Sequence, residues 1–113
     1  MGGHFVQGHV DGVAVVASRT PGDGWENVSF KVPGSLMEFI VEKGSITLDG
    51  VSLTVAELDD ANSSITVALI PETLKVTTLG AAQVGARVNV EVDVLGKYVA
   101  RAIAARMDGK NGN

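Results

Sequence analysis

The sequence predicts an all-β protein, a six-stranded antiparallel Greek-key barrel with short helices, one of them at the C-terminus. Short segments rich in valine, isoleucine and threonine recur along the chain, and turn-forming residues separate them. Helical periodicity occurs only in brief stretches between these segments. A chain of this size has little else to cover exposed strand edges, so we expect the sheet to close on itself.

Composition limits the core and the partners. The 113 residues suit one domain, and with 4% aromatic residues its core must be aliphatic. A net charge of −4 and scattered lysines and arginines argue against a nucleic-acid partner. The chain contains no cysteine, which excludes disulfide and thiolate chemistry. Since no apolar run approaches the roughly 20 residues of a membrane span, we expect a soluble, cytoplasmic protein without a membrane partner.

The N-terminal third predicts two strands. Residues 5–18 are extended, with Gly8 and Gly12 as bulges or points of close approach. Residues 20–24 form a turn. Residues 25–32 then alternate between polar and apolar side chains, which is the period of a half-buried strand.

Residues 33–44 predict a short helix. Ser35 and Glu38 have the spacing of a capping box at its start, and Gly44 is a typical residue just beyond a helix end.

The second half predicts a hairpin, two further strands and more helix. Residues 45–58 form two strands around Asp49 and Gly50, a pair that favours a type I′ turn. Residues 65–70 form the fifth strand, and Pro71 opens about one helical turn.

The C-terminal part of the sequence predicts the last strand of the barrel, followed by a helix. Valines alternate with polar residues over 86–95, which predicts the sixth strand. Residues 95–107 have apolar side chains near helical spacing, and the polar tail from 108 is expected to fray. We therefore expect the barrel to occupy residues 1–93, followed by a helix and tail over 94–113.

Both histidines lie near the N-terminus. His4 and His9 are five residues apart and point to opposite faces of a regular strand, and no cysteine or third histidine could complete a zinc site. We therefore predict no metal site. His9 and Asp11 share a strand face, so the carboxylate could orient the imidazole. The alternative is that His9 only hydrogen-bonds a turn.

Two further stretches carry polar groups suited to a ligand. Ser52 and Thr54 alternate with apolar neighbours and present two hydroxyls outward, although packing alone would also explain them. Pro71 stops strand pairing directly after Ile70, which would free main-chain groups to pair with an imide-like ligand edge. The alternative there is an ordinary strand-to-helix corner. Lys43 precedes Gly44 in a turn, where a solvated side chain is the usual case.

Four blocks in this order resemble a known family: GGHFVQGHVDG, KGSITLDGVSLTV, LIPETLKVTTLG and VGARVNVEVD. They are similar to the second of the two repeated barrel domains of the riboflavin synthase family, and the resemblance extends from Gly2 to Asp93. The first barrel, with its FTG start, is not in this sequence. We therefore interpret the chain as a C-terminal half.

The resemblance implies a reaction between two 6,7-dimethyl-8-ribityllumazine molecules. One gives a four-carbon unit to the other, which yields riboflavin and 5-amino-6-ribitylaminouracil with no metal or redox cofactor. Each barrel of the family holds one lumazine, and reaction occurs between the first barrel of one subunit and the second barrel of its neighbour. The protein need only hold two rings face to face and move protons.

The resemblance also implies site residues. Main-chain groups near Thr54 and Ile70 would bind the uracil-like edge, and His9 would face the second ring. The expected catalytic residues are His9, Ser52, Thr54 and Asp93. The expected ligand-binding residues are Gly8, His9, Val10, Lys43, Ser52, Leu53, Thr54, Ile70, Pro71, Glu72, Thr73, Leu74 and Lys75.

Two functions remain open from the sequence. The chain is either the lumazine-binding half of an enzyme or a non-catalytic module that binds lumazine or flavin. Its expected partners are 6,7-dimethyl-8-ribityllumazine, riboflavin, the N-terminal barrel of the full enzyme, and further copies in a homodimer or trimer. The apolar stripe of the C-terminal helix would serve such assembly.

Overall fold

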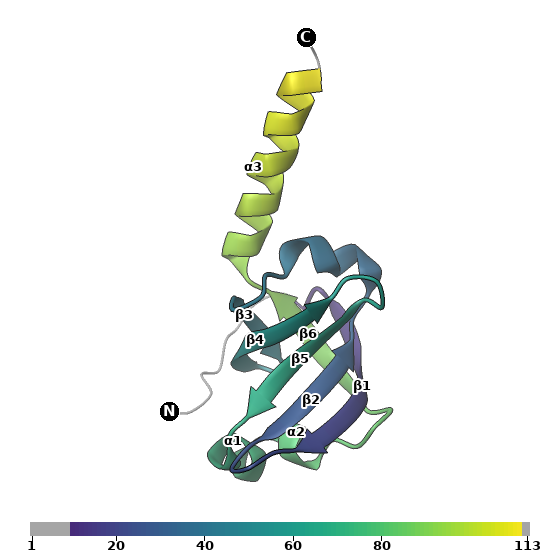
Figure 1. Ribbon diagram of the computed structural model, residues 1–113, viewed down its shortest axis with the longest axis vertical. Coiled ribbons are helices and arrows are strands. Elements are labelled where there is room, and N and C mark those ends of the chain that lie inside the picture. The colour runs from purple at the N-terminus through teal and green to yellow at the C-terminus, as the bar shows by residue number, and fades with distance from the viewer. Residues whose placement is uncertain (1–9, 112–113) are drawn as a thin grey trace.

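The computed structural model describes residues 10–111 and shows a closed antiparallel barrel (Figure 1). The strands neighbour one another in the order β1-β2-β5-β4-β3-β6, and β6 pairs back with β1. Consecutive strands β3, β4 and β5 adjoin, and β2 lies beside β5, which is a Greek key. The predicted fold class is confirmed. The strands are β1 (Gly12–Pro21), β2 (Glu26–Lys31), β3 (Ser45–Leu48), β4 (Val51–Asp59), β5 (Ser64–Leu69) and β6 (Arg87–Val92).

The core is aliphatic, as expected from the composition. Inward and outward positions alternate along β2 and β6, so that Val28 and Phe30 on β2 are buried, as are Val88, Val90 and Val92 on β6. The outward positions between them carry polar or small residues. Phe30 is the one aromatic side chain that is fully buried among the described residues.

The turn at Asp49 and Gly50 has the predicted type I′ character, because both residues have positive φ, 47° and 79°. Gly12 is a point of close approach, since a Cβ there would lie 3.1 Å from Leu36 Cδ1. The bulge in β1 lies elsewhere, between Val16 and Ser18. Gly8 lies outside the described residues.

The predicted helix over 33–44 is shorter and tighter than expected. It is the 3₁₀ helix η1 (Gly34–Phe39), it follows Pro33, and it has no side-chain cap. The predictions of a capping box at Ser35 and Glu38 and of a helix end at Gly44 are therefore wrong. Burial of Leu36 and Met37 holds η1 on the barrel, so tertiary packing takes the place of local capping.

Helix α3 (Val94–Asn111) projects away from the barrel (Figure 1). It extends beyond the predicted end at Met107 and includes part of the tail that was expected to fray. Its base is fixed at two points: Gly96 lies against the carbonyl of Phe39, where a Cβ would not fit, and Lys97 Nζ lies 2.8 Å from Asp11 Oδ1. Within the described part of the chain, no helix is long and apolar enough to cross a membrane.

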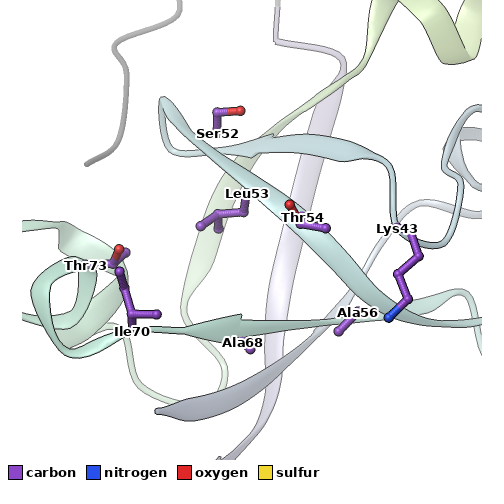
Figure 2. A pocket seen from close by; sticks show the side chains of 8 residues that line it. All are labelled: Lys43, Ser52, Leu53, Thr54, Ala56, Ala68, Ile70 and Thr73. Atoms are coloured by element: carbon purple, nitrogen blue, oxygen red, sulfur yellow. The ribbon is translucent and has the colours of Figure 1, made fainter. Parts of the chain in front are cut away.

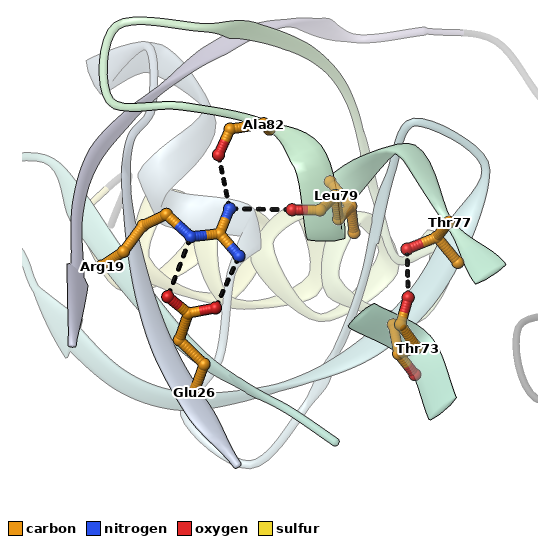
Figure 3. A network of polar contacts seen from close by, with 6 residues as sticks. All are labelled: Arg19, Glu26, Thr73, Thr77, Leu79 and Ala82. Atoms are coloured by element: carbon orange, nitrogen blue, oxygen red, sulfur yellow. Dashed lines mark hydrogen bonds and ion pairs between the residues drawn. The ribbon is translucent and has the colours of Figure 1, made fainter. Parts of the chain in front are cut away.

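Two short helices, α1 (Pro71–Val76) and α2 (Thr78–Ala81), lie at one end of the barrel (Figure 1). Pro71 occupies the first turn of α1, as predicted. Arg19 connects this segment to the strands (Figure 3). Its Nε and Nη2 donate to the two carboxylate oxygens of Glu26 at 3.0 and 2.7 Å, and its Nη1 donates to the carbonyls of Leu79 and Ala82.

The Arg19–Glu26 pair should make stability depend on pH in the acid range. The hydrogen bond from Arg19 holds the pKa of Glu26 below its usual value, against the opposing effect of desolvation. The contribution of the ion pair to the free energy of unfolding is therefore complete above about pH 4.3. It is lost as the pH falls through the lowered pKa of Glu26 in the folded state. We expect the urea midpoint of the wild type to fall more steeply below about pH 4.3 than that of Glu26→Gln. Parallel curves for the two proteins would contradict this.

Candidate functional site

An open pocket of about 420 Å³ lies on the outside of the barrel, where β4 and β5 separate (Figure 2). It is bounded by outward-facing residues of both strands, by the start of α1 and by the turn before β3. The lining residues are Lys43, Ser52, Leu53, Thr54, Ala56, Ala68, Ile70 and Thr73.

The pocket exists because the ladder between β4 and β5 stops short. The two strands pair from Asp59↔Ser64 only as far as Val55↔Val67, with a register shift between Val55 and Glu57. Beyond that point β4 pairs only with β3, and the end of β5 pairs only with β2. A gap therefore opens between residues 51–54 and residues 68–70.

Main-chain polar groups of β4 face this gap. Val55 donates to the carbonyl of Gly44 at 2.9 Å and accepts from the amide of Lys43 at 2.8 Å, so its main chain is directed toward β3. Main-chain direction alternates along a strand, so Thr54 and Ser52 direct their N–H and C=O groups the other way, toward β5. The register gives these groups no ladder partner on β5.

The expectation for Ile70 is only partly met. Its side chain lines the pocket and is 54% exposed, but its carbonyl accepts the amide of Leu74 at 3.0 Å and so begins the hydrogen bonds of α1. The carbonyl of Ile70 is therefore not free for a ligand, whereas main-chain groups of Ser52 and Thr54 on β4 face the gap.

The walls of the pocket differ in character. Leu53 is half-buried and packs against the core beneath the gap, while the hydroxyls of Ser52 and Thr54 are exposed. Thr73 on α1 is 8% exposed, and its side chain still borders the pocket. Lys43 is the charged member of the lining; it has a φ of 69°, and its ammonium group points toward Ala56 (Figure 2).

Sequence reasoning missed the two alanines that provide the space. Ala56 and Ala68 lie on outward-facing positions of β4 and β5, where neighbouring outward positions carry larger side chains such as Thr54 and Thr66. Leucine at either position would fill the gap. A small residue at an outward position of a β-rich segment was the available signal, and alternation alone does not distinguish it from ordinary surface.

The structure brings together six of the predicted ligand-binding residues and leaves others apart. Pro71 and Glu72 are exposed on α1 and Leu74 packs against the core, so none of them borders the pocket. Val10 is 52% exposed and is not in the lining either. Outside the described residues lie Gly8, His4, His9 and the side chain of Lys75. The six that meet are Lys43, Ser52, Leu53, Thr54, Ile70 and Thr73.

Asp93 does not line this pocket. Its Oδ1 accepts the amide of Leu95 at 3.0 Å, which caps the start of α3, and it borders a smaller pocket of about 210 Å³ together with Gly44 and Ser45. The carboxylate of Asp11 accepts from the amide of Val92 and from Lys97 Nζ, both at 2.8 Å. The described residues contain no group of three or more metal-ligating side chains.

Comparison with known proteins places these features in one family. Residues 7–93 match the family described as the lumazine binding domain. The riboflavin synthase of Mycobacterium tuberculosis (strain ATCC 25618 / H37Rv) is 52% identical over 102 residues, which are 89% of this chain and 51% of that protein. The riboflavin synthase of Actinobacillus pleuropneumoniae is 47% identical over 98 residues, 87% of this chain and 45% of that protein.

A solved structure agrees with these relatives. A crystal structure of LumP complexed with flavin mononucleotide superposes with a TM-score of 0.71 at 30% identity and covers 78% of this chain and 49% of that one. The chain spans about half the length of the curated relatives it matches. Since the matched region includes both strands that form the pocket and most of the chain, this protein belongs to the lumazine binding domain family.

Proposed function

We propose that this chain is the second, ligand-binding barrel of a riboflavin synthase, and that its pocket holds one molecule of 6,7-dimethyl-8-ribityllumazine or riboflavin. The observation that carries the proposal is the β4–β5 gap, where main-chain groups of Ser52 and Thr54 without a strand partner face an open pocket. In the complete enzyme one bound lumazine gives a four-carbon unit to another, and riboflavin and 5-amino-6-ribitylaminouracil are released.

The pocket suits a flat heterocycle that has a polar edge and a polyol chain. Main-chain N–H and C=O groups of β4 can pair with the alternating acceptors and donors of a pyrimidinedione. Leu53 and Ile70 offer apolar surface to the ring, and the hydroxyl of Thr73 and the ammonium of Lys43 offer hydrogen bonds to hydroxyls of the side chain. No metal or redox cofactor is needed for this binding.

Catalysis would come mainly from placing two rings together. The lumazine C7 methyl group is acidic because its anion delocalises into the ring, so positioning and proton transfer suffice. The pocket is open on the outer surface of the barrel, which leaves one ring face available to a second lumazine. We assign proton transfer or positioning at the facing ring to His9, and polar contacts with the bound ring to Ser52 and Thr54.

We propose Asp93 as a further catalytic residue that lies beside the ligand pocket and does not line it. Lys43 borders the main pocket, and the next two residues, Gly44 and Ser45, border the smaller pocket that contains Asp93. The smaller pocket that Asp93 borders therefore follows the proposed ligand pocket directly along the chain. We assign the carboxylate to a second ring brought in by a neighbouring barrel.

The same proposal covers domains and partners. The barrel over residues 1–93 would bind the ligand, and residues 94–113 would serve assembly with the N-terminal barrel or with further copies in a dimer or trimer. The side chains that support assembly are exposed and apolar on α3: Leu95, Tyr98, Val99 and Ile103. If the chain is part of a riboflavin synthase, we propose that it is located in the cytoplasm.

A non-catalytic flavin- or lumazine-binding module is the second candidate. It is favoured by the 30% identity to LumP, whose structure contains flavin mononucleotide. Binding requires only the pocket described here, whereas turnover requires a second bound lumazine. Activity in the presence of the first barrel of a riboflavin synthase therefore separates the two candidates.

Filling the pocket should weaken ligand binding without unfolding the barrel. Ala68 faces outward on β5, so Ala68→Leu fills the pocket and leaves the core intact. We expect the wild type to quench riboflavin and Trp25 fluorescence at micromolar ligand, and Ala68→Leu to bind at least about tenfold more weakly, which is about 1.4 kcal/mol. Ala17→Leu, at an exposed position on β1, is the matched control and should bind as the wild type does. Absence of any change with the wild type at high micromolar ligand would refute the proposed site.

The chain alone should form riboflavin very slowly. Holding two reactants in place can lower a barrier by on the order of 7–11 kcal/mol, and one barrel holds only one of the two lumazines. Adding the first barrel of a riboflavin synthase in trans should raise the rate of riboflavin formation measured by absorbance. Rapid turnover by the chain alone would mean instead that two copies pair into a complete site.

His9→Ala should reduce turnover more than binding. If the imidazole transfers a proton at the facing ring, its loss should lower kcat in the mixture with the first barrel by about 100-fold or more. The Kd for riboflavin, measured by fluorescence, should change little. Equal losses in kcat and in affinity would reassign His9 to ligand binding.

A further inference from the structure

We propose that Arg19 is a positioning residue for the ligand pocket, although it lies outside the pocket. Its guanidinium fixes the segment 70–82, which carries Ile70 and Thr73, to the end of the barrel. The inference rests on the proposed function, because its consequence is measured as ligand affinity. We call the set of Arg19, Glu26 and the carbonyls of Leu79 and Ala82 the Arg19 clamp.

The segment that the clamp holds has little stability of its own. Helices α1 and α2 have 6 and 4 residues, and neither has a side-chain cap at its start. Helices this short do not persist in water without tertiary contacts. Their apolar anchors are the fully buried Leu79 and the partly buried Leu74 and Ala82.

The clamp supplies the polar part of that anchoring (Figure 3). Glu26 accepts both Nε and Nη2 of Arg19, which fixes the plane of the guanidinium. Nη1 is then directed at the carbonyls of Leu79 and Ala82 at the end of α2, where helical carbonyls have no partners within the helix. The side chains of Arg19 and Glu26 are only 15% and 18% exposed, so water competes weakly for these bonds.

The clamp acts on both ends of the segment. Glu26 lies opposite Leu69 in the β2–β5 register, directly before Ile70 and the start of α1. Ala82, which Arg19 contacts, lies directly after α2. One ion pair thus joins the entry and the exit of the segment that closes this side of the pocket.

Close contacts between α1 and α2 couple their positions. Gly80 lies against the carbonyl of Leu74, where a Cβ would not fit. Thr77 donates its amide and its hydroxyl to the carbonyl of Thr73 at 3.2 and 2.6 Å (Figure 3). If α2 were released from Arg19, Thr73 and the wall of the pocket that it forms would lose their support.

The experiment compares affinity with stability in the full chain. Three variants are made: Arg19→Met, which removes the charge and the fork; Arg19→Lys, which keeps the charge; and Lys97→Met. The last is the matched control, because it removes the other described ion pair, Lys97–Asp11, at the base of α3. Riboflavin affinity is measured well below each unfolding midpoint, together with amide hydrogen exchange and the induced circular dichroism of riboflavin at saturation.

We expect Arg19→Met to raise the Kd for riboflavin at least tenfold and to alter the induced circular dichroism, with faster exchange in residues 71–82 and unchanged exchange in the barrel strands. Arg19→Lys should restore part of the affinity. Lys97→Met should keep the Kd within twofold, whatever it does to stability.

Wild-type affinity and dichroism in folded Arg19→Met would overturn the inference, as would losses that match those of Lys97→Met. If Arg19→Met does not fold, the same comparison is made with Arg19→Lys, for which wild-type affinity and unchanged exchange in residues 71–82 are the contrary result. Failure of the wild type to bind riboflavin would refute the proposed function instead. Exchange in residues 71–82 would still decide whether the clamp holds the segment.

Discussion

The end of the β4–β5 ladder at Val55 and Val67 is the constraint on which the rest of the site depends. A closed barrel normally pairs each strand on both sides along its length, because unpaired main-chain groups are costly when they are buried. Here closure continues through β3 and β2 while β4 and β5 part, so the unpaired groups of β4 lie at the surface. Water or a flat polar ligand can satisfy them there. The gap is thus tolerated by the fold and is available for binding.

The helical segment after β5 completes the pocket, and it depends on tertiary contacts. Its two helices are too short to form alone, and they are held by the burial of Leu79 and by the guanidinium of Arg19. The segment contributes Ile70 and Thr73 to the lining. The strands contribute the other lining residues and pack on the aliphatic core of the barrel, whereas polar bonds from Arg19 help to hold the helical segment.

Alternation along the strands predicted much of the fold and part of the site. It placed Ser52 and Thr54 on the outward face of β4, and the Asp49–Gly50 pair identified the hairpin that fixes their register. Local rules failed where packing decided the outcome. The capping box at Ser35 did not form, and η1 is held instead by buried Leu36. The carbonyl of Ile70 is not free because it begins the hydrogen bonds of α1.

The sequence by itself determined the class of fold, the aliphatic core and the resemblance that names the ligand class, because these depend on residue pattern and on the order of motifs. Only the tertiary structure decided which predicted residues meet. Asp93 caps α3 outside the pocket that Lys43 and Thr54 line, and Ala56 and Ala68 leave the space for that pocket. Neither result can be read from spacing along the chain, since each depends on which segments the closed barrel brings together and on where its strands stop pairing.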